Sequence, residues 1–448
     1  MTAADIALVN FCFPKDINIF APPQGLLSIN SFLFLNGIYS TIYDIAKDLN
    51  VSDFHSDKLV SYLYDIPEDI IGFSCWDSVL PHIIQATKYL KERFPHKTII
   101  LGGPSASNLQ LKLLQYFKWI DFIISGEGEL PLYLLISKLK TRKSVLFHEL
   151  PSNIAGRDSG TIQLGQQPKA VLKADQIPKS DVSFIDVNKY NRWELSSSRG
   201  CPYNCEFCSV NSTLDNTIRF KNIGNIFDEL KTLFKTTNTD CVNIVDDNFG
   251  LQKDRFQLFC KSFKSVFENK IWTCYFRLDD LLPDTVDLMV QAGCIGAFIG
   301  IEAGNTDKLR SIGKLMPVKE IISRLKYATT KMDITASFIW GFPDETEKQL
   351  LDSFNLIDKI ASFDNILVDL YQLSPLSGTA IQRKLNGNIS FDSNAISGFI
   401  YPPYLPKIEK SIIALVKEFP DIFSAFYHEN STLFWNKHQM VNKFLSKN

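Results

Sequence analysis

Residues 196 to 208 read Ser196-Ser197-Ser198-Arg199-Gly200-Cys201-Pro202-Tyr203-Asn204-Cys205-Glu206-Phe207-Cys208. Three cysteines stand in C-x3-C-x2-C spacing after the strand-like run 192–195, and an aromatic residue, Phe207, directly precedes the third. Three thiolates leave one iron of a four-iron, four-sulfur cube without a protein ligand. An open iron can bind a substrate-like molecule, whereas a cluster with four cysteines normally only transfers electrons.

The alternative for the same cysteines is a zinc knuckle. Structural zinc takes four closed ligands, usually as two pairs of cysteine or histidine. No second pair follows Cys208. The spacing therefore favours an iron–sulfur cluster, with Cys201, Cys205 and Cys208 as its metal ligands and candidate catalytic residues.

The composition predicts two or three domains with a large core. The 448 residues are 45% hydrophobic and the net charge is only −2, which gives no indication of a nucleic-acid-binding surface. The N-terminus carries Asp5 and lacks a basic stretch followed by a long apolar one, and no apolar run reaches membrane-spanning length. We therefore expect a cytoplasmic protein without a membrane partner, whose nine cysteines are reduced thiols or metal ligands.

Residues 1 to 140 alternate strand-like and helical patterns. Strand-like apolar runs occupy 6–11, 39–44, 70–74, 98–101 and 122–125, and helical patterns occupy 25–36, 81–94, 108–117 and 130–139. This alternation predicts a doubly wound, Rossmann-like parallel sheet, whose ligands lie beyond the carboxyl ends of the strands. The turns at those ends are rich in glycine, which lets a backbone approach a large ligand closely. They are 22–25, Ser74-Cys75-Trp76-Asp77, Gly102-Gly103-Pro104-Ser105 and Gly126-Glu127-Gly128-Glu129.

The rest of the chain contains a linker and a second alternating region. Residues 141 to 190 have no long period, and the glycine-rich, polar run 153–165 predicts a hairpin within them. From 191 to 390 the alternation resumes. Strands are expected at 192–195, 241–245, 272–276, 295–301, 335–340 and 366–373, with helices at 223–234, 255–267, 283–291, 318–329 and 345–360.

The cysteine motif resembles that of the radical S-adenosylmethionine (SAM) superfamily, in which the open iron chelates the amino and carboxylate groups of SAM. With the turns at 102–104 and 126–129 before it, the chain is similar, over roughly residues 1–385, to radical SAM enzymes that carry an N-terminal cobalamin (B12)-binding domain. The resemblance implies a (β/α)6 partial TIM barrel over 191–390, with chemistry at the carboxyl ends of its strands. It also implies three cofactors (a 4Fe–4S cluster, SAM and cobalamin) and an external electron donor of flavodoxin or ferredoxin type.

Three N-terminal turns would contact cobalamin in this resemblance. The candidate residues are Ser74, Cys75, Trp76, Gly102, Gly103, Pro104, Ser105, Gly126, Glu127, Gly128 and Glu129. The Asp-x-His-x-x-Gly motif that supplies a cobalt-ligating histidine in other cobalamin proteins is missing after the first strand, and His55 reads as a surface histidine. Trp76 is large enough to cover the corrin ring. Its alternative role is packing on the helix that starts at Pro81.

The barrel strands end in candidate SAM contacts. The resemblance implies Phe207, Asp246, Asp247, Arg277, Glu302, Gly341, Phe342 and Pro343. Two structural alternatives stand beside these roles. Asp246-Asp247-Asn248 could instead cap the next helix, and Glu302 could form a structural ion pair with Arg277.

The remaining cysteines and the C-terminal region give further information on the class of enzyme. No cysteine follows Cys294, which excludes the auxiliary clusters of some radical SAM families, and Cys241, Cys260, Cys274 and Cys294 are expected in the core. Residues 391 to 448 are aromatic-rich, with helical patterns at 407–417 and 434–445. We expect this helical region to cap the barrel and shape the substrate pocket.

These features predict a cobalamin-dependent radical SAM methyltransferase. It would methylate an unactivated carbon of a small-molecule or peptide natural product, using a 5′-deoxyadenosyl radical and methylcobalamin, while the protein supplies orientation and excludes water. One alternative keeps both cofactors but performs oxidative cyclisation or rearrangement without methyl transfer. An alternative of another class is a non-catalytic zinc-binding module.

Overall fold

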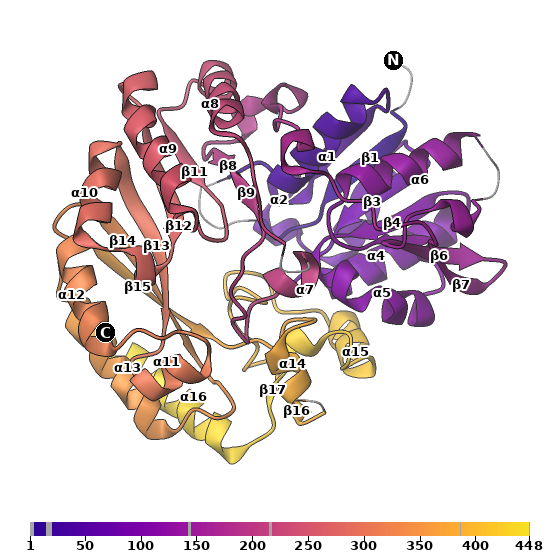
Figure 1. The fold of residues 1–448 in the computed structure, drawn as a ribbon. Helices are drawn as coiled ribbons and strands as arrows, with labels where there is room; N and C mark the ends of the chain where they lie inside the picture. The colour runs from indigo at the N-terminus through magenta and orange to yellow at the C-terminus, as the bar shows by residue number, and fades with distance from the viewer. Residues whose placement is uncertain (1–3, 15–19, 142–144, 215–216, 386, 448) are drawn as a thin grey trace.

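Two β-sheets make up the two halves of the molecule, and the C-terminal residues lie against both (Figure 1). The computed structural model describes residues 4–14, 20–141, 145–214, 217–385 and 387–447. The first sheet has seven strands in the order β2-β1-β3-β4-β5-β6-β7, and the second has six in the order β15-β14-β13-β12-β11-β8. Both halves alternate strands with helices, so the predicted α/β fold class is confirmed.

The first sheet is a doubly wound sheet with an added hairpin. Its elements are β1 (Ile6–Asn10), α1 (Gln24–Leu35), β2 (Ser40–Asp44), α3 (Ser56–Tyr64), β3 (Ile70–Ser74), α4 (Leu80–Arg93), β4 (Thr98–Gly102), α5 (Pro104–Tyr116), β5 (Phe122–Ile124) and α6 (Glu129–Thr141). β1 to β5 are parallel, and their order puts a topological switch point between β1 and β3, where a ligand crevice is expected. The hairpin predicted at 153–165 is present as β6 (Ile154–Asp158) and β7 (Thr161–Leu164), and it extends this sheet with antiparallel strands.

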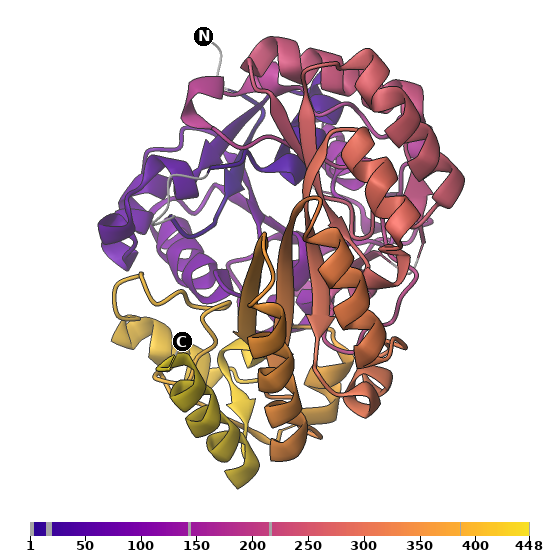
Figure 2. The same ribbon diagram turned by 90° about the vertical axis from the view of Figure 1, so that its left-hand side faces the viewer.

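The second sheet is the predicted partial barrel. Its elements are β8 (Glu194–Leu195), α8 (Ile223–Thr237), β11 (Cys241–Ile244), α9 (Lys253–Val266), β12 (Ile271–Phe276), α10 (Pro283–Gln291), β13 (Cys294–Glu302), α12 (Val318–Ala328), β14 (Asp333–Trp340), α13 (Glu347–Ile360) and β15 (Ile366–Gln372). All six strands are parallel, and the helices cover the outer face of the sheet, in front of the strands in Figure 2. Alternate residues of β13 (Ala297, Ile299 and Ile301) enter the core beneath these helices. Phe298, Gly300 and Glu302 therefore face the interior of the barrel.

The helix boundaries follow side-chain signals in the sequence. Thr346 and Gln349 form a capping box at the start of α13, and the side chain of Asn222 accepts a hydrogen bond from the first turn of α8. None of the helices in the described ranges is long and apolar enough to cross a membrane.

The C-terminal region packs on the barrel, which it was expected to cap, and also on the first half. The expected helices are present as α15 (Lys410–Glu418) and α16 (Thr432–Leu445). α16 lies on α13, where the rings of Phe354 and Phe444 stack with centroids 4.3 Å apart. Residues 400–427, however, join the hydrophobic cluster of α3, α4 and α5 in the first half. The apolar face of a helical pattern is readable from sequence, but its partner is not.

Candidate active site between the two sheets

A cavity of about 680 Å³ opens at the carboxyl ends of the first-sheet strands. It is lined by the residues that follow β1 and β3, on either side of the topological switch point, and by the start of α1. On its far side it reaches Arg199, next to the cysteine loop, and Val245 and Asp247, after β11 of the barrel. The crevice of the first sheet and the mouth of the second therefore meet in one space.

Most of the predicted cobalamin contacts line this cavity. They are Ser74, Trp76, Gly102, Gly103, Pro104, Gly126, Glu127, Gly128 and Glu129. Cys75 and Ser105 do not, because both are fully buried beneath it. The Cys75 carbonyl accepts a hydrogen bond from the Ser105 amide at 3.2 Å, so these two residues fasten one turn to the next instead of facing a ligand.

The glycines in these turns satisfy a steric requirement. Gly103 has φ +91°, and a Cβ there would lie 2.9 Å from the backbone nitrogen of Cys75. Gly126 has φ +78°, in the left-handed region that side chains rarely adopt. The two turns thus place bare backbone at the cavity wall, which suits a large, flat ligand.

Trp76 is well placed to cover such a ligand. Its side chain is 51% exposed and lines the cavity. Its carbonyl accepts hydrogen bonds from Val79 and Leu80, at the entry to α4. His55, in contrast, precedes α3 and does not line the cavity.

Glu129 has a buried partner that the sequence patterns did not reveal. Its carboxylate is fully buried and accepts hydrogen bonds from Arg199 at 2.5 Å and from Ser28 at 2.6 Å. Burial alone would raise the pKa of Glu129, but the positive charge of Arg199 lowers it below its ordinary value. Glu129 therefore remains ionised and joins the turn after β5 to the residue that stands two positions before Cys201.

Glu127 has a similar role. Arg219 approaches it with both terminal nitrogens, one of them 2.9 Å from Oε2, and Arg199 lies 3.3 Å from the same carboxylate. Arg199 and Arg219 belong to the paired short strands β9 (Ser198–Arg199) and β10 (Arg219–Phe220), which flank the cysteine loop. We call these four side chains the acidic-turn network. In the sequence, only the two acids in one turn and the arginine before the first cysteine indicated this network.

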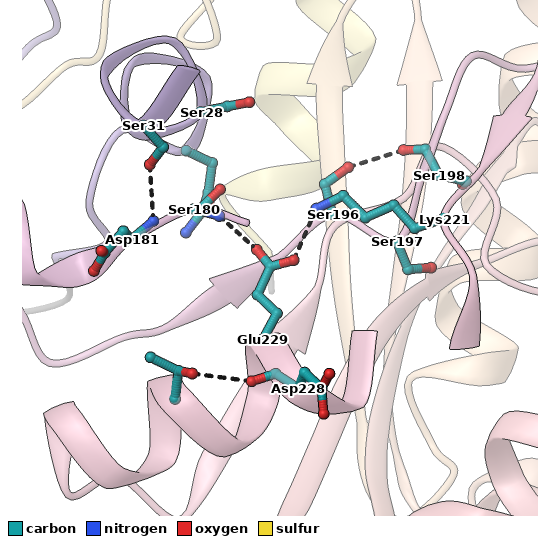
Figure 3. Close-up of polar contacts among 12 residues, drawn as sticks. Ser28, Ser31, Ser180, Asp181, Ser196, Ser197, Ser198, Lys221, Asp228 and Glu229 are labelled. Atoms are coloured by element: carbon teal, nitrogen blue, oxygen red, sulfur yellow. Dashed lines mark hydrogen bonds and ion pairs between the residues drawn. The ribbon is translucent and has the colours of Figure 1, made fainter. Parts of the chain in front are cut away.

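A second polar contact joins the halves at the edge of the cavity (Figure 3). The Glu229 carboxylate of α8 accepts hydrogen bonds from Lys221 and from the Ser180 amide, both at 2.9 Å. The Asp181 amide donates to the Ser31 hydroxyl of α1 at 3.0 Å. Lys221 is buried and lines the cavity, so this contact closes its wall near the linker.

The two adjacent aspartates after β11 have different surroundings. Asp246 is buried and accepts hydrogen bonds from the amides and hydroxyls of Ser197 and Ser198, at 2.5 to 3.0 Å. These hydrogen bonds make it an anchor for the strand before the cysteine loop, and its expected contact with SAM stays a prediction. Asp247 lines the cavity, and desolvation by the surrounding cavity wall together with the charge of Asp246 raises its pKa to about 6. Neither residue caps a helix, because Gln252 precedes α9.

Arg277 and Glu302 lie at the ends of adjacent strands but do not pair with each other. The Arg277 guanidinium stacks over the ring of Tyr203, 3.7 Å from its centroid, and donates to Asp279. Glu302 instead receives Lys314 at 2.8 Å. The alternative of an ion pair between Arg277 and Glu302 is therefore wrong.

The backbone at Glu302 is unusual. Its φ of +74° and the register shift between Gly300 and Glu302 mark an irregularity at the end of β13. A left-handed non-glycine residue costs free energy, and such residues concentrate at functional sites. The geometry turns the Glu302 side chain towards Lys314.

The turn after β14 touches the cysteine loop. The rings of Phe342 and Phe207 meet edge to face, with centroids 6.0 Å apart. Gly341 has φ +96°, and its amide donates to the Glu345 side chain at 3.0 Å. Two of the predicted SAM contacts, Phe207 and Phe342, are thus in direct contact, although the residues 341–343 do not line the cavity.

The three motif cysteines lie in one loop and are partly buried. The Cys208 amide donates to the Cys205 carbonyl at 3.1 Å. Burial raises the pKa of the Cys208 thiol to about 11 and also raises that of Cys201. Three thiolates are the number that would ligate three irons of a cube and leave the fourth open. As expected, Cys260, Cys274 and Cys294 are buried in the core, whereas Cys241 is half-buried on β11.

Comparison with known families agrees with this architecture. The radical SAM superfamily matches residues 195–357, and the B12 binding domain matches residues 17–136. A B12-binding domain followed by a radical SAM barrel defines one class of enzymes. The chain belongs to it: this protein is a cobalamin-dependent radical SAM enzyme, whose cofactors are a 4Fe–4S cluster, SAM and cobalamin. The zinc-module alternative is thereby set aside.

Relatives of more than one activity resemble the chain. An uncharacterized methyltransferase of Pyrococcus horikoshii is 24% identical over 76% of this chain and 73% of its own length. The anaerobic magnesium-protoporphyrin IX monomethyl ester cyclase of Rubrivivax gelatinosus is 23% identical over 75% of this chain and 61% of its own length. The chain thus spans less than two thirds of the length of some of its relatives.

Solved structures share the fold at low identity. The radical SAM methyltransferase TsrM from Kitasatospora setae superposes with a TM-score of 0.74 and 14% identity, over 98% of this chain and 88% of that one. The cobalamin-dependent SAM radical enzyme OxsB gives a TM-score of 0.71 and 16% identity, over 98% and 66%.

The cysteine ligands can be tested with a matched pair of variants. Cys205→Ala should lose bound iron and SAM cleavage, because two thiolates cannot hold the cube with one open iron. Iron content and 5′-deoxyadenosine formation after anaerobic reconstitution measure both effects. Cys241→Ala, outside the loop, is the control and should retain both. Full SAM cleavage by Cys205→Ala would contradict the assignment.

The acidic-turn network should contribute measurably to stability. Arg199→Met leaves the buried Glu129 without its cation and should lower the free energy of unfolding by about 3 kcal/mol. Urea denaturation with tryptophan fluorescence measures this change. The control is Arg310→Met, which removes an arginine that is 64% exposed and should cost less than about 1 kcal/mol.

The pH dependence of that loss has a definite sign. In the native protein the lowered pKa of Glu129 contributes stability at neutral pH, and this contribution is lost as the pH falls through its folded pKa. In Arg199→Met, burial without the cation should raise that pKa, so the variant should regain relative stability in mild acid. A stability difference that grows towards acid would contradict this explanation.

Proposed function

We propose that this enzyme methylates an unactivated carbon of a small-molecule or peptide natural product. The observation that supports the proposal is the continuity of the cavity, from the glycine turns of the first sheet to Asp247 at the barrel mouth. A methyl donor held in the first half and a radical generated in the second would then act on the same carbon. Methyltransferases among the relatives point the same way.

The cofactors would carry the difficult chemistry. When bound, the cluster and SAM supply a 5′-deoxyadenosyl radical that abstracts hydrogen, and methylcobalamin supplies the methyl group. The cysteine loop would hold the cluster, and an external donor of flavodoxin or ferredoxin type would deliver its electrons. The protein itself would orient the substrate and keep water out.

Residues at the barrel strand ends would bind SAM. Asp247 lines the cavity and can accept hydrogen bonds from an ammonium group. Glu302, at the end of β13, is held in place by Lys314 and offers a second acceptor. Arg277 is a fixed cation suited to a carboxylate. The contact between Phe207 and Phe342 would place the turn 341–343 on the adenine side of SAM.

The first half would bind cobalamin through backbone more than through charged side chains. Ser74, Gly102, Gly103, Pro104, Gly126 and Gly128 would form the wall against which the ring lies. Glu127 and Glu129 line the same cavity, but their carboxylates are held by Arg199 and Arg219, so we assign them to shaping the turn. Trp76 would cover the face of the ring.

The second candidate is an oxidative cyclisation or rearrangement without methyl transfer. It is favoured by the relative from Rubrivivax gelatinosus, which is named as a cyclase. The cavity and the cysteine loop would serve either reaction.

Isotope labelling separates the two candidates. The reconstituted enzyme would be incubated anaerobically with methyl-deuterated SAM, methylcobalamin, a reductant and candidate small molecules or peptides. Methylation gives a product that gains one methylene unit, with the deuterium label appearing after repeated turnover. Cyclisation or rearrangement gives 5′-deoxyadenosine and a changed product without label. Product formation without 5′-deoxyadenosine would contradict both candidates.

The lower face of cobalt gives a spectroscopic prediction. We expect cobalamin to bind with its own base displaced, and no histidine is among the described residues that line the cavity. Bound cob(II)alamin should therefore show no nitrogen superhyperfine splitting in its spin-resonance spectrum. Trp76→His should introduce that splitting, because this side chain projects at the cavity wall. Trp435→His, on α16, is the control and should leave the spectrum unchanged. Nitrogen splitting in the unaltered enzyme would contradict the prediction.

A further inference from the structure

The C-terminal helix α16 buries a lysine beneath the turn that follows β14. The Lys437 side chain has no exposed area, and its ammonium donates to the Phe342 carbonyl at 2.6 Å. The same ammonium lies 3.8 Å from the carboxylate of Glu345, which is also fully buried. A charge this deep costs free energy unless its hydrogen bonds are specific.

The contacts converge on one carbonyl. The Phe342 carbonyl accepts the Glu345 amide at 3.0 Å as well as Lys437, and Glu345 in turn receives the Gly341 amide. The Gly341 amide donates to Oε2 of Glu345, whereas Oε1 has no hydrogen-bond partner within the described ranges. Residues 341–345 are therefore held by hydrogen bonds among themselves, and Lys437 adds a donor from a distant part of the chain.

A second lysine contacts the ring of Phe342. Lys308 is buried, its ammonium lies 4.4 Å from the centroid of the Phe342 ring, and it pairs with Asp344 at 2.6 Å. The ring therefore contacts both Lys308 and Phe207, which precedes Cys208 of the cluster loop. The orientation of the turn against the cysteine loop thus depends on its two lysines.

The helix that carries Lys437 is itself firmly docked. Phe434 stacks near Trp340 at the end of β14, and Asn436 donates to Glu347 at the start of α13 at 2.7 Å. These contacts hold Lys437 in register with the turn. No pattern in the sequence linked position 437 to position 342, since the two lie 95 residues apart.

We propose that Lys437 is a positioning residue for SAM, acting through the Phe342 carbonyl on the turn 341–345. The inference rests on the proposed adenine-side role of that turn. Lys437 touches neither the cavity nor the cysteine loop, and it would act by holding the turn in the conformation that receives SAM. The C-terminal helix would thereby belong to the binding machinery of the barrel.

Two variants separate positioning from simple charge compensation. Lys437→Met removes the donor to Phe342 but leaves Glu345 buried and unpaired, so both SAM affinity and thermal stability should fall. Lys437→Met/Glu345→Gln removes both charges, while the glutamine oxygen can still accept the Gly341 amide. Stability should then recover, whereas the weakened SAM binding should remain, because the Phe342 carbonyl still lacks its ammonium donor.

The measurements are made on the reconstituted enzyme. Calorimetry of SAM binding without reductant should give a Kd that rises about tenfold in both variants, as expected for one lost charge-assisted hydrogen bond. Amide hydrogen exchange at 341–345 should become faster in both, and the visible spectra of the cluster and cobalamin should not change. Lys443→Met, at an exposed position of the same helix, is the control and should bind SAM normally.

The outcomes distinguish this proposal from the proposed function. A SAM Kd that recovers together with stability in the double variant, or that is normal in both variants, would overturn the positioning role. If the unaltered reconstituted enzyme fails to bind SAM, the proposed function fails instead. If the unaltered enzyme binds SAM and both Lys437 variants bind it weakly, with no recovery of affinity in the double variant, the positioning role and the proposed function are both supported.

Discussion

The pairing of Arg199 with Glu129 is the constraint on which the site depends. It joins the turn after β5, in the first half, to the short strand that leads into the cysteine loop, in the second. The pair is buried, so neither charge can leave without a large free-energy cost. The distance between the wall of the cavity and the cluster loop is therefore fixed by one guanidinium, with Arg219 and Glu127 as a second tie beside it.

The same principle recurs elsewhere in the site. Asp246 holds the strand before the loop through Ser197 and Ser198, and Lys437 holds the turn after β14 from the C-terminal helix. In each case a charged side chain binds backbone or hydroxyl groups from a distant part of the chain. At Asp246 the next residue, Asp247, is left facing the cavity. A site that handles reactive radicals needs this rigidity, since misplacement by a fraction of an ångström exposes them to side reactions.

Sequence patterns predicted the two sheets, the partial barrel, the hairpin and the cysteine loop, because each depends on local periodicity or on spacing within a few residues. The glycine turns were also predictable, since positive φ requires particular residue types. The partners of charged residues were not. Cys75 and Ser105 stand in a cavity turn but point beneath it, and Asp247 lines the cavity whereas Asp246 does not. Arg199 reaches a glutamate 70 positions earlier. Strand ends indicate where a side chain emerges, whereas its partner depends on how two sheets are packed together.

The packing of residues 400–427 has a consequence for how the protein is made. These residues complete the hydrophobic cluster of α3, α4 and α5, where Phe117 meets Phe419 and Phe423. During synthesis, the first half emerges from the ribosome long before the segment that covers it. Its apolar face stays open to water, or to chaperones, until residues 400–427 have been translated. The first half is therefore not a separable module: a chain cut after the barrel would keep every cavity-lining turn and yet be prone to aggregate through the uncovered helices.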